Sequence, residues 1–185
     1  MKRVLLIIVM TFIGMNVNYA QEYKANVSNS KLYVSGTSTL HDWECNVKDF
    51  QGKVNAVIEN GKLVAIKSFD FSFKVKSLDS GKSAMDKKTF EALKEEKYPT
   101  ISYKGDKVTL NNGKATFYGQ MYIAGVSKSF ETSVDVNLSN GVLTLKGAEA
   151  FKLATFDIEP PTAMFGTIKT GEEVSIHYDL QLTTK

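Results

Sequence analysis

Apolar side chains occupy every second position through most of the chain from Leu32 to the C-terminus. The clearest runs of this alternation are residues 69–75, 115–123, 130–138, 143–147 and 174–182. A period of two is typical of strands that bury one face and leave the other in water. Asn-Gly pairs, which are strong hairpin signals, separate several runs, at positions 60–61, 112–113 and 140–141. The pattern therefore predicts consecutive antiparallel strands joined by short links.

We expect eight such strands, over residues 31–37, 43–58, 63–77, 100–110, 114–123, 127–138, 142–153 and 172–183. The second strand changes parity, because its apolar residues are odd-numbered up to Val47 and even-numbered from Phe50. This switch indicates a bulge near Lys48-Asp49. Since closure removes exposed strand edges, the predicted fold is all-β, an eight-stranded antiparallel up-and-down barrel of lipocalin type.

Two segments do not fit the pattern of strands and short turns. Residues 83–97 predict a short amphipathic helix, which opens with a Ser83-x-x-Asp86 capping box and ends before Pro99. Its apolar face is expected to lie on the barrel mouth and comprises Met85, Thr89, Ala92 and Leu93. Residues 157–171 form a long loop with several apolar side chains, which we expect to pack down on the mouth as a lid.

The N-terminus has the pattern of a secretory signal peptide. Met1-Lys2-Arg3 is basic, residues 4–17 are apolar, and Ala20 is a small residue after which cleavage is expected. An uncleaved N-terminal anchor is the alternative. The pattern predicts a signal peptide at 1–20, a flexible polar segment at 21–30, a barrel domain at 31–185, and a periplasmic or secreted location.

Charge and cysteine content narrow the function. The chain has 23 basic and 20 acidic residues, and loss of Lys2 and Arg3 with the signal peptide leaves a net charge of +1. Arg3 is also the only arginine, so a nucleic-acid partner is not expected. Cys45 is the only cysteine, so there is no internal disulfide, and its parity with Trp43 predicts a buried, inert thiol.

No motif predicts catalysis, a metal or a cofactor. His41-Asp42-Trp43-Glu44-Cys45 collects ligand-type residues, but neighbours on a strand point to opposite faces, so three convergent ligands are not expected. Nucleophile-elbow, zinc-protease, phosphate-loop and haem motifs are missing from the sequence. His177 is out of phase with the inward residues and is expected to be exposed. We therefore predict a protein that is not an enzyme.

A hollow apolar barrel is a ligand cavity. Parity predicts that the inward residues most suited to contact an apolar ligand are Trp43, Phe71, Phe73, Phe117, Met121 and Phe151. The candidates at the mouth are Met85, Phe90, Met164 and Phe165. The alternative is that these side chains fill the barrel end as ordinary core.

Several short motifs resemble the YceI-like domain family over roughly residues 30–183. They lie at positions 38–43, 97–101, 123–128, 151–158 and 170–171. The resemblance implies an extended lipocalin-like barrel, often periplasmic or secreted, in a family with members that bind polyisoprenoids. The chain departs from better-known bacterial members at Thr39–Trp43 and in its longer loop at 160–166.

The leading hypothesis is non-enzymatic carriage or storage of a long apolar ligand, a polyisoprenoid or other lipid, inside the barrel. The second is a packed structural barrel that docks a protein partner through residues 157–171. The third is an enzyme that uses His41 with Asp42 or Glu44. Transient contact with a membrane surface and formation of a homodimer stay open at this point.

Overall fold

The structure is a computed structural model that describes residues 20–184, so the predicted signal peptide lies outside the described residues apart from Ala20. The elements in chain order are β1 (Gln21–Ala25), η1 (Val27–Asn29), β2 (Lys31–Ser38), β3 (Trp43–Val47), β4 (Gln51–Glu59), β5 (Lys62–Lys74), η2 (Val75–Ser77), β6 (Leu78–Asp79), α1 (Ser83–Ala92), β7 (Thr100–Asn111), β8 (Lys114–Ile123), β9 (Val126–Ser139), β10 (Val142–Lys152), η3 (Leu153–Phe156), β11 (Thr162–Ala163), η4 (Met164–Gly166) and β12 (Ile168–Thr183), where η marks a 3₁₀ helix. No helix in this part of the chain is long and apolar enough to cross a membrane.

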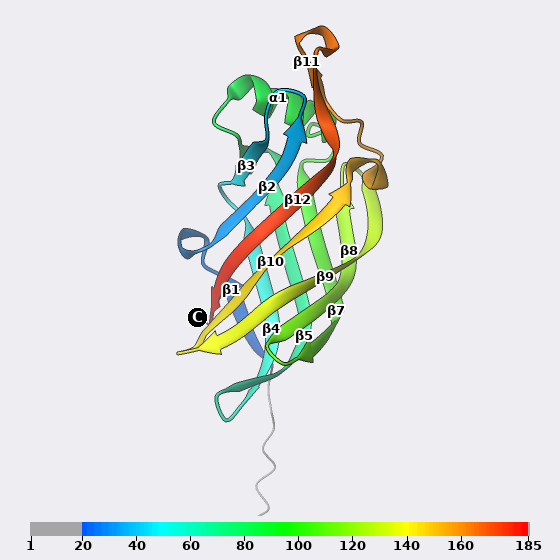
Figure 1. Ribbon diagram of the computed structural model, residues 1–185. Helices are drawn as coiled ribbons and strands as arrows, with labels where there is room; N and C mark the ends of the chain where they lie inside the picture. Colours follow the sequence, from blue (N-terminus) through cyan, green and yellow to red (C-terminus); the bar gives the residue numbers. More distant parts are fainter. Residues whose placement is uncertain (1–19, 185) are drawn as a thin grey trace, which may run out of the picture.

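The strands close into a barrel (Figure 1). We call each strand position around the barrel a stave, and three of the staves are each made of two shorter strands in line. β1 and β2 run in the same direction along β12, where Lys24 pairs with Thr183 and Lys31 with Asp179. β3 and β4 continue one another along β2 and β1, and β6 and β5 do so along β3 and β4. Each interrupted stave counts as one strand, so the predicted eight-stranded antiparallel barrel is confirmed.

The three interruptions lie side by side. η1, residues 48–50 and η2 occupy neighbouring staves, and the Lys48 amide donates to the Ser77 carbonyl at 2.8 Å across two of them. The parity switch near Lys48-Asp49 therefore marks a break between two strands, β3 and β4, and not the predicted bulge within a single strand. After the break Phe50 points into the core, where it is buried.

The prediction of a flexible segment at residues 21–30 is wrong for its first half. Residues 21–25 form β1, which pairs with β4 over four residues and with the end of β12. Tyr23 is only 3% exposed. The sequence does not predict this strand, because only one of its five side chains is buried and the others are polar or only partly buried.

The predicted turns are present. At each Asn-Gly pair both residues are left-handed, with φ of 51° and 74°, 46° and 78°, and 51° and 77° in chain order. Such pairs suit the right-handed twist of hairpin strands. Gly125 has φ of 90°, and a Cβ there would lie 2.4 Å from the Tyr98 ring, so both conformation and space require glycine.

The interior is dense at the end of the barrel that carries these Asn-Gly turns. Val54, Ala56, Ala115, Leu143 and Leu182 are all fully buried there. Toward the other end, Phe69 contacts Tyr103 and Phe117 with ring centroids 4.8 and 5.0 Å apart. The Tyr103 hydroxyl donates to the Phe117 carbonyl at 2.8 Å and lies 3.1 Å from that of Phe130.

Tyr103→Phe should lower the free energy of unfolding by about 1–2 kcal/mol, because it removes a buried hydrogen-bond donor and leaves two carbonyls less satisfied. Urea denaturation followed by far-ultraviolet circular dichroism measures the change. Tyr118→Phe is the matched control, since the Tyr118 hydroxyl has no hydrogen bond to any residue within 20–184 and its ring lies beside Lys107. Equal effects of the two changes would contradict the assignment.

Candidate functional site

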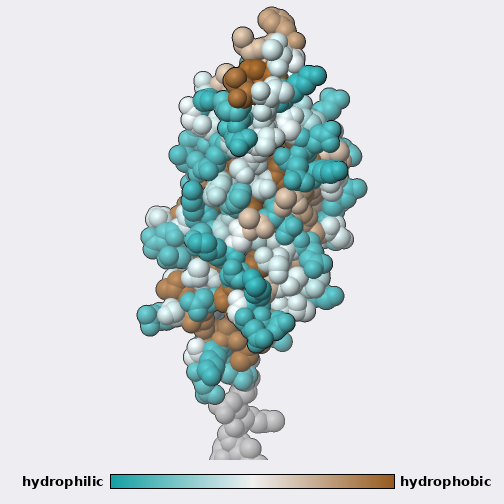
Figure 2. All heavy atoms as spheres, in the orientation of Figure 1, coloured by the Kyte–Doolittle hydropathy of each residue, from teal (hydrophilic) through white to brown (hydrophobic). Residues whose placement is uncertain are grey.

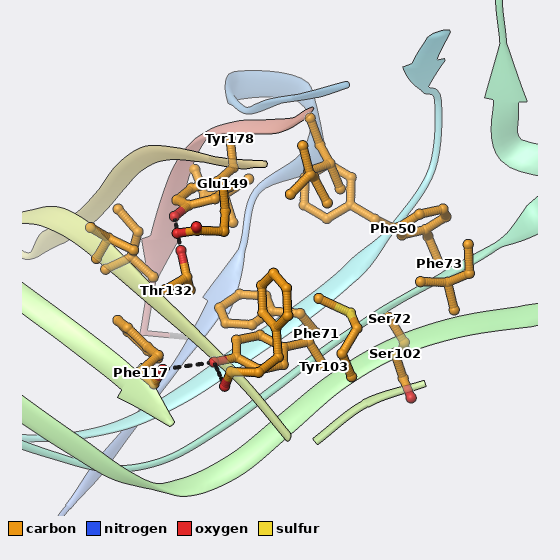
Figure 3. Close-up of a pocket in the computed structure, with 18 of the residues that line it drawn as sticks. Phe50, Phe71, Ser72, Phe73, Ser102, Tyr103, Phe117, Thr132, Glu149 and Tyr178 are labelled. Carbon is orange, nitrogen blue, oxygen red and sulfur yellow. Dashed lines mark hydrogen bonds between the residues drawn. The ribbon is translucent and has the colours of Figure 1, made fainter. Parts of the chain in front are cut away.

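Two cavities lie inside the barrel. The outer cavity, of about 500 Å³, is bounded by α1, the β11–β12 hairpin and the strands beneath them. The inner cavity, of about 90 Å³, lies deeper among the aromatic side chains (Figure 3). Phe73, Ile101, Met121 and Ile176 line both, so these four side chains form the partition between them.

The volumes decide what each cavity can hold. Small-molecule sites in proteins typically measure roughly 300–1,000 Å³. The outer cavity falls within this range, and its lining is mostly apolar. A water molecule occupies about 30 Å³ in the liquid. The inner cavity therefore has room for about three waters or one small chemical group.

Eight of the ten side chains predicted to contact a ligand line one of the cavities. Those on the outer cavity are Trp43, Met85, Phe151 and Met164. Those on the inner cavity are Phe71 and Phe117, and those on both are Phe73 and Met121. The structure thus gathers residues from β3, β5, α1, β8, β10 and η4 around the two cavities.

Phe90 and Phe165 line neither cavity. Phe90 lies beside the predicted apolar face of α1 and packs against the core. Phe165 stands fully exposed in the solvent. Parity and helical spacing place a side chain on a face, but they do not say how far it lies from a cavity.

Helix α1 presents the predicted face to the outer cavity, through Met85, Thr89, Ala92 and Leu93. The helix ends at Ala92, earlier than expected, and the predicted capping box is wrong. Asp86 instead accepts hydrogen bonds from the amide and hydroxyl of Ser80, at 2.8 and 2.6 Å. These bonds fix the loop that leads into the helix, because they join it to the first turn.

The loop at 157–171 does not pack down as a lid along its whole length. Thr162 pairs with Lys169 and Ala163 with Ile168, so the segment rises as a hairpin above the mouth (Figure 1). Its base lines the outer cavity through Pro161 and its neighbours. Its tip turns through left-handed backbone, which leaves Met164 69% exposed.

The rim of the outer cavity carries polar groups. His41, Lys82 and Lys88 line it, with His41 Nε2 lying 3.3 Å from Lys82 Nζ. His41 Nδ1 lies 2.6 Å from the Asp42 backbone oxygen. In the described part of the chain, no three His, Cys, Asp or Glu side chains converge as a metal site would require.

His177 lies on the outer face, as parity predicts, but it is only partly exposed. Its ring stacks on Tyr33 with centroids 4.5 Å apart, and Nε2 lies 2.9 Å from the Ser35 hydroxyl. The expectation of a freely exposed histidine missed this cross-strand neighbour, because Tyr33 lies directly opposite in the β2–β12 ladder.

The sequence prediction also missed polar residues of the inner cavity. Thr132, Glu149 and Tyr178 line it, and the Thr132 and Tyr178 hydroxyls lie 2.7 Å apart (Figure 3). A signal for Glu149 was present, because it shares the inward parity of Leu143, Leu145 and Phe151.

The sequence model of the YceI-like domain family matches residues 23–182. The chain belongs to the YceI-like domain family. No curated protein matches it significantly. The family assignment therefore accords with the barrel and with the resemblance found in the sequence.

Solved structures share the fold. BcnA of Burkholderia cenocepacia is 18% identical with a TM-score of 0.72, and the match covers 85% of this chain and 98% of BcnA. A polyisoprenoid binding domain from Saccharophagus degradans is 12% identical with a TM-score of 0.65, and the match covers 88% of this chain and 98% of that domain's chain. A YceI protein of Campylobacter jejuni is 18% identical with a TM-score of 0.64, and the match covers 76% of this chain and 84% of the Campylobacter jejuni chain.

The reactivity of the Cys45 thiol tests how completely this side chain is buried. The thiol is buried, and burial, with smaller effects of Asp86 and Asp79, raises its pKa from 9.0 to about 12. Because the thiolate is the reactive form, iodoacetamide should alkylate the folded protein at pH 8 about a thousandfold more slowly than the chain unfolded in guanidinium. Mass spectrometry of timed samples measures both rates. Similar rates in the two states would contradict the buried placement.

Proposed function

We propose that the protein binds a long apolar molecule, a polyisoprenoid or another lipid, in the outer cavity, and carries or stores it without catalysis. The observation that carries this proposal is a mostly apolar cavity of about 500 Å³ beneath α1 and the hairpin. Membership of the YceI-like domain family supports it, as does the structural neighbour named as a polyisoprenoid binding domain.

The energetics favour a chain-like hydrocarbon. Each buried methylene contributes about 0.8 kcal/mol, so one five-carbon isoprene unit contributes about 4 kcal/mol before ordering costs are subtracted. The outer lining also includes Met85, Met121 and Met164. Methionine is flexible and polarizable, so such a lining can adapt to the shape of a bound chain.

The competing hypotheses have less support. A packed barrel would lack a cavity of this size. The enzyme hypothesis pairs His41 with the carboxylate of Asp42 or Glu44, but among residues 20–184 no hydrogen bond or ion pair joins the ring to either carboxylate, and Nδ1 lies 2.6 Å from the Asp42 backbone oxygen. We further propose that the protein works in the periplasm or outside the cell, because its first 20 residues have the pattern of a signal peptide.

Filling the outer cavity should abolish binding. Ala92→Trp places an indole on the cavity face of α1, and we expect the affinity for geranylgeraniol to fall at least about tenfold, since the ligand and the new ring need the same space. Co-elution of radiolabelled geranylgeraniol on gel filtration measures the affinity. Lys87→Trp adds the same ring on the exposed side of α1 and should bind like the wild type. Unchanged binding by Ala92→Trp, or none by the wild type, would contradict the proposal.

We also propose that the mouth of the barrel contacts a membrane surface. Among residues 20–184, the large apolar side chains that stand exposed are Leu40, Val64, Met164 and Phe165. All but Val64 lie at the cavity end. The loop that carries Leu40 is joined to the hairpin, because the Thr39 amide donates to the Lys169 carbonyl at 3.0 Å. Figure 2 shows apolar surface at this end, over the hairpin.

A membrane is the occupant that best explains this grouping, because a ligand leaving a bilayer would meet the opening directly. Replacing Met164 and Phe165 together by Ser should remove most co-sedimentation with vesicles of phosphatidylethanolamine and phosphatidylglycerol, since the tip supplies the buried apolar area. Val64→Ser, near the Asn60-Gly61 turn at the opposite end, is the control and should not change it. Equal losses would contradict membrane contact through the tip. A concentration-dependent dimer that the tip changes abolish would favour a second copy instead.

A further inference from the structure

The charged side chains that line the outer cavity are basic. In the described part of the chain they are Lys82, which precedes α1, and Lys88 within it, and His41 lies beside Lys82 at the same rim. No aspartate or glutamate of residues 20–184 belongs to this lining. The atoms that the inner cavity exposes are apolar, whereas the outer cavity also exposes some polar atoms. The polar end of a ligand is therefore better accommodated at the mouth than in the depth of the barrel.

Two separate elements bring His41 and Lys82 together. His41 follows β2 and Lys82 precedes α1, and Figure 1 shows the end of β2 beside α1. His41 Nδ1 lies 2.6 Å from the Asp42 carbonyl oxygen, which can only accept, so Nδ1 carries the proton. The other ring nitrogen, Nε2, faces the Lys82 ammonium at 3.3 Å and accepts from it. This hydrogen bond holds the ammonium at the rim and uses one of its three N–H groups.

Lys82 has no internal counter-charge. Asp79 and Asp86 are its nearest acidic neighbours in the sequence, but Asp79 forms an ion pair with Lys48 at 3.2 Å and Asp86 accepts two hydrogen bonds from Ser80. Within the described residues, no carboxylate forms an ion pair with Lys82. The ammonium therefore presents a positive charge to a molecule in the outer cavity.

This rim selects among the possible ends of a ligand. An amine would bring like charges together. A hydroxyl would only exchange a hydrogen bond to water for one to the ammonium. A phosphate monoester carries roughly −1.5 to −2 charges at pH 7 and has three strong acceptor oxygens. Lysine binds phosphate as a point charge, whereas the bidentate pairing that suits a carboxylate needs arginine, and the only arginine is Arg3 in the predicted signal peptide.

We propose that Lys82, held by His41, binds a phosphate head group of the ligand, so that the protein prefers an isoprenoid phosphate to the corresponding alcohol. The inference rests on the proposed function and adds the head group and the orientation of the ligand. The phosphate lies at the rim, and the chain extends beneath α1 toward Phe73 and Met121 of the partition. Lys88 adds positive charge at the same cavity, although Glu91 pairs with it at 2.9 Å.

The test compares geranylgeranyl phosphate with geranylgeraniol, which has the same chain and no charge, by gel filtration at low ionic strength. The wild type should bind the phosphate about tenfold more tightly, and high salt should reduce this ratio because the rim is exposed. Lys82→Gln should bring the ratio close to one and leave affinity for the alcohol unchanged, which shows that the cavity persists. Lys87→Gln makes the same change of charge on α1 outside the cavity lining and should keep the wild-type ratio.

Two further measurements separate the parts of the site. His41→Leu removes the acceptor that holds Lys82, so it should lower the ratio to about threefold without changing affinity for the alcohol. An excess of inorganic phosphate should not displace geranylgeranyl phosphate, because it buries no apolar chain. An unchanged ratio in His41→Leu would contradict the role of the histidine.

Several outcomes overturn the inference but leave ligand binding intact. They are equal affinity of the wild type for the phosphate and the alcohol, a preference that Lys82→Gln retains, and equal losses in Lys82→Gln and Lys87→Gln. Ready displacement by inorganic phosphate would also overturn it, because the rim would then bind anions without a lipid. If the wild type binds neither compound, the proposed function itself fails, and the inference that rests on it fails too.

Discussion

The pairing of β12 with both β1 and β2 is the constraint on which the rest of the molecule depends. It closes the sheet, so that the alternate apolar side chains of the barrel strands point into one interior. The dense end is filled by residues such as Val54 and Leu143. Toward α1 the same closed wall encloses space that its own side chains do not fill.

Much of this fold follows from the sequence for simple reasons. A period of two and Asn-Gly turns are local signals, and both survive in the structure because nothing in the tertiary fold opposes them. The parity switch before Phe50 also reports a real break. β1 was missed because its pairing partners are distant in sequence and only Tyr23 among its side chains is buried. The polar sequence predicts a flexible segment there, but pairing with β4 and β12 makes residues 21–25 a strand.

The candidate site was predictable in outline but not in detail. Parity placed Phe73, Phe117 and Met121 inward, which is a property of each strand alone. Whether Phe165 folds over the mouth or stands away from it depends on a two-residue hairpin between β11 and β12, which the sequence signals only weakly. Glu149 lies on the inward face of β10 but is not among the predicted lining residues, because the prediction selected large apolar side chains only.

Together, the two cavities form a site of unequal parts: a wide, mostly apolar space beneath α1 and the hairpin, and a narrow space among the aromatic side chains. The central claim is that the wide space holds a lipid. Native mass spectrometry of the protein, purified without detergent and then extracted with organic solvent, tests it most directly. We expect a stoichiometric adduct that releases a molecule with a long apolar chain. An unliganded mass, both as purified and after incubation with geranylgeraniol, would contradict the claim.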